Sequence, residues 1–203
     1  MIGRMSILGA RHVFWEPSSD AGLEHLWLEL LHDRLVADGL ILRQVRQETP
    51  VRLWYRLRCD GSACVRGAQL RLWQEDAERR LDLQADGTGR WADGAGRPLT
   101  DLDGCIDLDI AATPFTNTLP IRRLGLRPGG AADIEVVYIT VPDLRVSRVR
   151  QRYTCLRADE GSGVYLYENL QNGFRADLPV DADGLVLDYP GQWRRRGPGE
   201  IAT

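Results

Sequence analysis

The sequence predicts one mainly β domain over residues 1–203, built from antiparallel hairpins with a single α-helix. Three observations predict this fold class. Asp-Gly and Asn-Gly dipeptides, which accept the positive φ angles of tight hairpin turns, recur along the chain. Between them, apolar and polar residues alternate with the period of a half-buried strand. Residues 117–126 combine helix-start residues with helical spacing of apolar side chains.

The turn dipeptides divide the chain into short segments. They are Asp38-Gly39, Asp60-Gly61, Asp86-Gly87, Asp93-Gly94, Asp103-Gly104, Asn172-Gly173 and Asp183-Gly184. We therefore expect hairpins along nearly the whole chain.

Residues 22–37 fit two structures. Leu23, Leu26 and Leu30 recur at helical spacing, so propensity favours a helix. Residues 27–31 are followed by His32-Asp33 and then by Asp38-Gly39, which is the pattern of a hairpin. Because the surrounding segments are all β, we favour the hairpin.

The next segments show the clearest strand patterns. In residues 51–59, the side chains of Leu53, Tyr55 and Leu57 point one way, and arginines and a tryptophan point the other. The same alternation occurs in residues 70–73 and 81–83. In residues 106–110, isoleucines and a leucine share one face, and Asp107 and Asp109 share the opposite face. A period of two predicts a strand in each segment.

One helix and the last strands complete the chain. Thr116 or Asn117 can cap a helix over residues 117–126, with Pro120 in its first turn. Residues 134–141 are β-branched and apolar on both faces, which predicts a fully buried strand or a subunit contact. Residues 174–178 and 185–189 are expected to form the last hairpin, around residues 180–184.

Composition excludes several classes of function. All 26 basic residues are arginines and the net charge is -3, without a basic block, so we expect no nucleic-acid partner. No apolar run has the length of a signal peptide or a transmembrane segment, so we expect a cytoplasmic chain whose four cysteines are reduced thiols. Cys59 and Cys64 have no partners at zinc-site spacing, and no cofactor motif occurs. We expect neither a metal nor a cofactor.

Two stretches, residues 102–124 and 174–194, resemble a bacterial family described as "putative glycolipid-binding". The most specific part is Thr113-Pro-Phe-Thr-Asn-Thr-Leu-Pro-Ile-Arg-Arg123, and weaker similarity extends over residues 15–195. The resemblance implies a β-roll, in which a long antiparallel sheet spirals around one helix, and a homodimer. It also implies an amphipathic ligand such as a glycolipid, a function that was inferred within the family from likeness of shape.

The segment that resembles the family supplies most candidate binding residues. Thr116 and Asn117 could meet a headgroup at the start of the helix, although simple helix capping is the alternative that we favour. Arg122 and Arg123 could pair with a ligand's phosphate or carboxylate. An internal ion pair with Asp107 or Asp109 is again the favoured alternative, because a buried, unpaired Arg is costly. Our hypothesis is a non-catalytic binding protein with a cavity between sheet and helix.

Aromatic and acidic residues supply further binding candidates and two alternative hypotheses about function. The candidate ligand-binding set also includes Asp107 and Tyr153. Further aromatic residues could line a groove or simply pack across strands: Tyr165, Tyr167, Tyr189, Trp15, Trp54, Trp91 and Trp193. An alternative hypothesis is a small-molecule enzyme that uses Asp107, Asp109 and Arg122 with Tyr153. A third hypothesis is a structural homodimer without a ligand.

Overall fold

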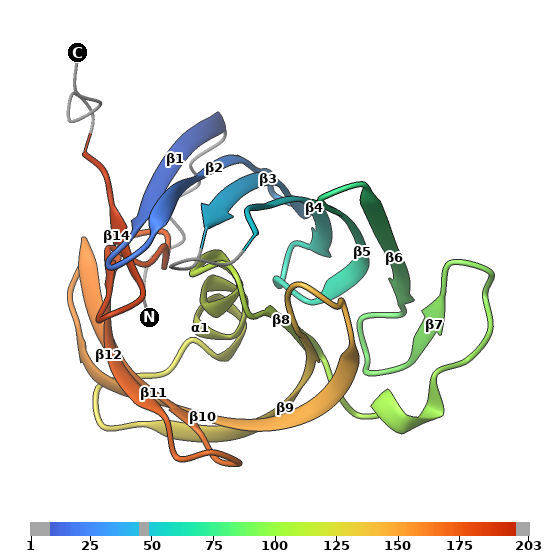
Figure 1. The fold of residues 1–203 in the computed structure, drawn as a ribbon. Coiled ribbons are helices and arrows are strands. Elements are labelled where there is room, and N and C mark those ends of the chain that lie inside the picture. Colours follow the sequence, from blue (N-terminus) through green and yellow to red (C-terminus); the bar gives the residue numbers. More distant parts are fainter. Residues whose placement is uncertain (1–8, 45–48, 198–203) are drawn as a thin grey trace.

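The computed structural model describes residues 9–44 and 49–197, and these residues form two sheets with one α-helix between them. The larger sheet has nine strands in the order β13-β14-β1-β2-β3-β4-β5-β6-β7, and the smaller has five in the order β12-β11-β10-β9-β8. Viewed along the helix axis, the smaller sheet curls below the helix and the larger sheet arches above it (Figure 1). The predicted spiral arrangement of antiparallel strands around a helix is therefore confirmed.

The larger sheet is antiparallel throughout. Its strands are β1 (Gly9–Pro17), β2 (Ala21–Leu30), β3 (Arg34–Gln44), β4 (Val51–Asp60), β5 (Val65–Gln74), β6 (Ala77–Ala85), β7 (Trp91–Asp93), β13 (Asp188–Tyr189) and β14 (Trp193–Arg195). Strands β1 to β7 follow one another as hairpins, whereas β14 returns from the end of the chain and pairs with β1. The two ends of the described chain therefore meet in one sheet.

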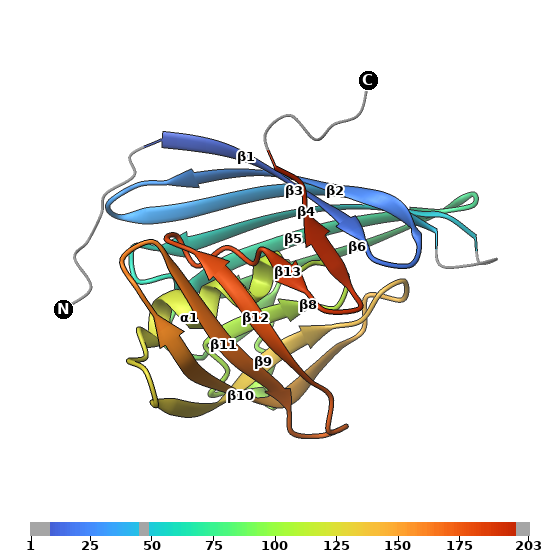
Figure 2. The same cartoon turned by 90° about the vertical axis from the view of Figure 1, so that its left-hand side faces the viewer.

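The smaller sheet contains the one parallel pair among the described strands. Its strands are β8 (Asp107–Ile110), β9 (Ala131–Ile139), β10 (Val146–Ala158), β11 (Ser162–Asn169) and β12 (Arg175–Asp181). Strand β8 runs parallel to β9 because the helix lies in the connection between them. Seen from the side, the helix is enclosed between the two sheets (Figure 2).

The predicted helix is present but starts differently from the prediction. A 3-10 turn, η2 (Phe115–Asn117), leads into α1 (Thr118–Leu124), and Gly125 ends the helix in a left-handed conformation with φ of 53°. No side chain caps the start of α1, because the Thr116 and Asn117 side chains bond elsewhere. The capping prediction was therefore wrong. No helix among the described residues is long and apolar enough to cross a membrane.

The ambiguous segment, residues 22–37, forms the predicted hairpin. Strands β2 and β3 pair from Ala21 to Leu30 around a short turn at residues 31–33. The expected turn at Asp38-Gly39 is wrong, because both residues lie inside β3. Gly39 is needed there for another reason: a Cβ at this position would overlap the ring of Tyr55 on β4. The other turn dipeptides lie at or beside turns.

Alternation of side chains places the core as expected. In β4, Leu53, Tyr55 and Leu57 are fully buried, whereas the arginines of the other face are exposed and Trp54 is half-buried. Leu119 of the helix joins the cluster under the larger sheet, whereas Ile121 joins the cluster on the smaller sheet. The helix therefore connects the two halves of the core. Strand β8 differs from this alternation, because Asp107, which lies on the face opposite Leu108 and Ile110, is also buried.

The expected last hairpin connects two different sheets. Strand β12 belongs to the smaller sheet and β13 to the larger one, and one isolated bridge, Val180 to Val186, joins the chain on either side of the turn. The turn itself is held by Asp181, whose Oδ1 accepts the backbone N–H groups of Asp183 and Leu185. The chain therefore crosses between sheets at this turn.

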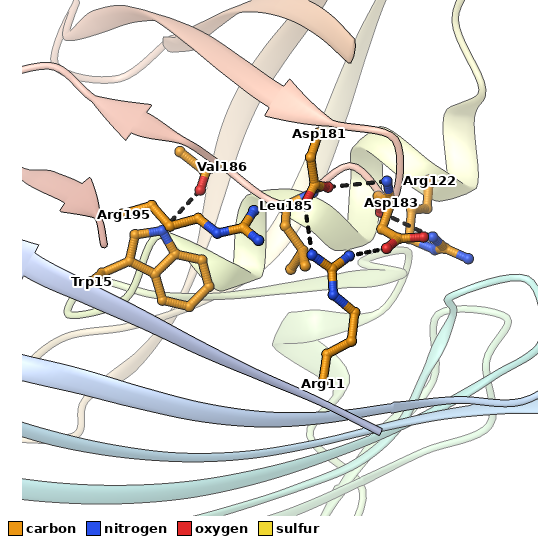
Figure 3. A network of polar contacts seen from close by, with 8 residues as sticks. All are labelled: Arg11, Trp15, Arg122, Asp181, Asp183, Leu185, Val186 and Arg195. Atoms are coloured by element: carbon orange, nitrogen blue, oxygen red, sulfur yellow. Dashed lines mark hydrogen bonds and ion pairs between the residues drawn. The ribbon is translucent and has the colours of Figure 1, made fainter. Parts of the chain in front are cut away.

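Ion pairs and hydrogen bonds attach this turn to β1, β14 and the helix (Figure 3). Arg11 of β1 pairs with Asp181 and Asp183, and Arg195 of β14 pairs with Asp181 at 2.6 Å. Arg122 of the helix donates to the Asp183 carbonyl at 2.9 Å. These contacts lie at the place where the two sheets meet and help to keep them together.

Candidate functional site

A pocket of about 170 Å³ lies where β13 and β14 of the larger sheet meet the smaller sheet. We call it the seam pocket. Both sheets contribute to it: Asp109 comes from β8, Tyr138 from β9, Tyr167 from β11 and Trp193 from β14. Asn117, just before the helix, also lines it. The shape of the site therefore depends on how the two sheets are positioned relative to each other.

One wall of the seam pocket is aromatic. The rings of Tyr167, Phe174 and Tyr189 lie 6.2 to 6.3 Å apart, centroid to centroid, and are inclined to one another by 46 to 73°. Such spacing and tilt are those of a mutually packed aromatic group. Phe174 remains 37% exposed at the turn between β11 and β12. The three rings thus pack against one another, and the wall is open to solvent at Phe174.

Four side-chain amides are among the polar groups of the seam pocket. Asn117, Asn169, Asn172 and Gln192 line it, and Asp109 is its one carboxyl group. Amides can both donate and accept hydrogen bonds, whereas an ionised carboxylate only accepts them. The pocket can therefore bind several hydroxyl groups in defined orientations.

Asp109 is fixed by neutral partners. Thr116 donates its hydroxyl to Oδ1 at 2.9 Å, and Gln151 donates its amide to Oδ2 at 2.7 Å. The Gln151 amide also donates to the Tyr167 hydroxyl at 3.1 Å, which ties the carboxyl group to the aromatic wall. Burial raises the pKa of Asp109, and the two hydrogen bonds offset only part of that effect.

A second buried carboxyl group lies behind the pocket. Thr113, which lines the pocket, donates its hydroxyl to Glu24 Oε1 at 2.6 Å, and Tyr55 donates to the same oxygen at 2.6 Å. Glu24 is fully buried, and its Oε2 has no hydrogen-bond partner among the described residues. Burial raises the pKa of Glu24 to about 8, so this side chain is mostly protonated at neutral pH.

The structure places the predicted ligand-binding residues in different surroundings. Asn117 lines the seam pocket, and Tyr153, which is buried, donates to Asn117 Oδ1 at 2.8 Å and so orients it. Thr116 acts on the pocket through Asp109. Arg123 pairs with Asp107 at 2.5 Å, which is the internal ion pair that the sequence favoured. None of Thr116, Tyr153, Arg123 and Asp107 is itself part of the pocket lining.

The proposed enzymatic dyad is not assembled. Asp109 lines the pocket, but the Asp107 carboxylate is bound by Arg123, and Arg122 bonds to the Asp183 carbonyl near the turn after β12. The sequence predicts a cavity between sheet and helix, but Leu119 of the helix is fully buried there and packs in the core under the larger sheet. The pocket lies beside the start of the helix instead.

Sequence reasoning identified part of the pocket. Tyr167, Tyr189 and Trp193 were among the aromatic candidates and do line it, whereas Tyr165, Trp15 and Trp91 are core residues. Tyr138, Phe174 and the amides Asn169, Asn172 and Gln192 were missed. The Asn-Gly turn at residues 172–173 was a usable signal, since loops that join strands often carry binding residues.

The family described as "Putative glycolipid-binding" matches residues 12–195, a span that includes every residue of the seam pocket. The chain belongs to this family. It is also similar to a crystal structure of a DUF1089 family protein from Pseudomonas aeruginosa, with 44% sequence identity and a TM-score of 0.78. That similarity covers 89% of this chain and 94% of the other. No protein of curated function matches the sequence.

Proposed function

We propose that this protein is a non-catalytic binding protein that holds the polar head of an amphipathic ligand, such as the sugar of a glycolipid, in the seam pocket. The observation that carries this proposal is an aromatic wall facing amides and a carboxyl group in one pocket. The apolar face of a sugar ring can stack on Tyr167 and Tyr189, while its hydroxyls bond to Asp109 and the amides. The family's description also supports a glycolipid.

The size of the pocket limits which part of the ligand enters. Its volume of about 170 Å³ is below the roughly 300 to 1,000 Å³ of pockets that enclose drug-sized molecules. A single sugar ring suits this space better than a lipid chain does. The chain would then lie outside the pocket, along Leu170 and Phe174, which are each 37% exposed on the same turn.

Titration with octyl glucoside below its micelle concentration tests this proposal. We expect saturable binding in calorimetry, with a change in tryptophan fluorescence because Trp193 lines the pocket. Phe174→Ala should weaken binding by about 3- to 10-fold, the loss expected for one aromatic contact. Leu42→Ala is the matched control, since Leu42 is 50% exposed on β3 and does not line the pocket. Equal weakening by both variants, or no binding to the unmodified protein, would refute the proposal.

We also propose that the protein acts as a homodimer, as the resemblance to the family implies. Exposed leucines support this proposal: Leu156 of β10 is 48% exposed, and Leu187, just before β13, is 37% exposed. Native mass spectrometry measures the oligomeric state directly. A monomer at micromolar concentration would contradict this part of the proposal.

A further inference from the structure

The charge of the seam pocket is unbalanced. Asp109 is the only carboxyl group among its lining residues, and no Arg, His or Lys lines it. Throughout the described part of the chain, Asp109 has no ion-pair partner, whereas Asp107, two residues earlier on β8, has Arg123 at 2.5 Å. The fold thus supplies a guanidinium to one of these two carboxylates and only neutral donors to the other.

Asp109 can accept further hydrogen bonds from the pocket. Each of its oxygens receives one bond, from Thr116 and from Gln151, and an ionised carboxylate has about four acceptor positions. The side chain lies deep in the protein but keeps some exposed surface at the pocket. Burial of a carboxylate without a cation is costly, and a ligand that brings a positive charge would relieve that cost.

The aromatic residues around Asp109 favour the same kind of ligand. Tyr138, Tyr167 and Tyr189 line the pocket, and the negative face of an aromatic ring attracts a cation placed over it. Arg43, which stacks on a lining residue of the pocket, and the helix residue Arg122 both have other partners. Arg122 bonds to the Asp183 carbonyl (Figure 3), and Arg43 stacks on Trp193 at 5.2 Å while paired with Asp20. An anionic headgroup would therefore find no free cation in this pocket.

We propose that the seam pocket selects a headgroup that carries a positively charged ammonium group, which pairs with the Asp109 carboxylate and lies against the tyrosine rings. An amino sugar and a choline-like or ethanolamine-like head share this chemistry. The inference rests on the proposed function and narrows its ligand class. It also assigns Asp109 as the residue that determines specificity, in place of Arg122 and Arg123.

Four probes with the same octyl chain test the inference in one calorimetric series. They are octyl glucoside, its 2-amino-2-deoxy counterpart, octyltrimethylammonium and octyl phosphate, each below its micelle concentration. We expect the amino counterpart to bind about 10-fold more tightly than octyl glucoside, because hydrogen bonds to charged groups are the strong ones. Octyltrimethylammonium should also bind, and its rank against the amino sugar shows which source of ammonium fits better. Octyl phosphate should bind most weakly.

Two variants locate the preference. Asp109→Asn should remove the 10-fold advantage of the amino sugar, so that this sugar and octyl glucoside bind with similar affinity. Tyr138→Leu should weaken the binding of both ammonium probes more than the binding of octyl glucoside. This variant tests the inference even if Asp109→Asn folds poorly. Asp177→Asn, a change at an exposed position of β12, is the control. Equal binding of octyl glucoside and its amino counterpart, or tight binding of octyl phosphate, would overturn the inference alone. Failure of every probe to bind would overturn the proposed function as well.

Discussion

Replacement of Glu24 by Gln should change how the stability of this protein depends on pH. Glu24 lies in β2, fully buried, and accepts hydrogen bonds from Tyr55 and Thr113 on one oxygen. Burial raises the pKa of Glu24 from 4.5 to about 8. Glutamine has nearly the same shape, and its carbonyl oxygen can accept the same two bonds, but it does not titrate.

The sign of the effect follows from the direction of this shift. Below pH 4.5 the carboxyl group is protonated in both the folded and the unfolded chain, so it adds no pH dependence. Between pH 4.5 and pH 8 the unfolded chain has released the proton and the folded chain has kept it. The free energy of unfolding then falls by about 1.4 kcal/mol per pH unit. From pH 5 to pH 8 the loss is about 3 to 4 kcal/mol, and above the folded-state pKa it stays constant.

Urea unfolding followed by tryptophan fluorescence, from pH 5 to pH 8.5, measures this loss. The difference between the unmodified protein and Glu24→Gln isolates one carboxyl group, because all the other titrating groups are common to both. We expect the unmodified protein to lose about 3 to 4 kcal/mol relative to the variant over this range. Glu160→Gln is the control at an exposed position, and its free energy of unfolding should differ from that of the unmodified protein by the same amount at every pH. A constant difference for Glu24→Gln would show that Glu24 is ionised in the folded state, which would refute the reasoning.

Three further changes test contacts of the fold by urea unfolding. Gly39→Ala should cost about 1 to 3 kcal/mol, because the added Cβ would overlap the Tyr55 ring, and an unchanged midpoint would contradict this close packing. Asp107→Ala should cost about 3 kcal/mol by leaving Arg123 unpaired, and a second change, Arg123→Met, should recover most of that loss. If stability is not recovered, the cost does not come from the unpaired guanidinium. Asp181→Ala should cost about 2 kcal/mol, since it removes the acceptor of two guanidinium and two backbone N–H groups. A loss below about 0.5 kcal/mol would contradict that role.

Local patterns predicted the strands well and the partners of some side chains poorly. The alternation in residues 51–59 appears directly as the buried and exposed faces of β4. The turn expected at Asp38-Gly39 failed because the glycine there makes room for the ring of Tyr55 on a neighbouring strand. A glycine required by a tertiary contact and one required by a turn have the same sequence signature.

The site shows the same division. Tyr167, Tyr189 and Trp193 were recognised as possible groove residues, but the sequence contains nothing that separates them from Trp15, whose indole N–H bonds to the Val186 carbonyl in the core. Amides such as Gln192 were missed because an isolated polar residue in a turn is common. Only the crossing of the chain from β12 to β13 brings these residues to the same pocket.

The sequence by itself determined the strand segments, the single helix and the family, because alternation, turn chemistry and a long specific motif are all local properties of the chain. Tertiary structure alone decided the roles of Asp107 and Asp109. These two carboxylates lie on one face of β8 and look equivalent in sequence, but the docked helix brings Arg123 to the first and leaves the second facing the seam pocket. Which buried charge receives a partner depends on where the helix packs, and no spacing along the chain records that position.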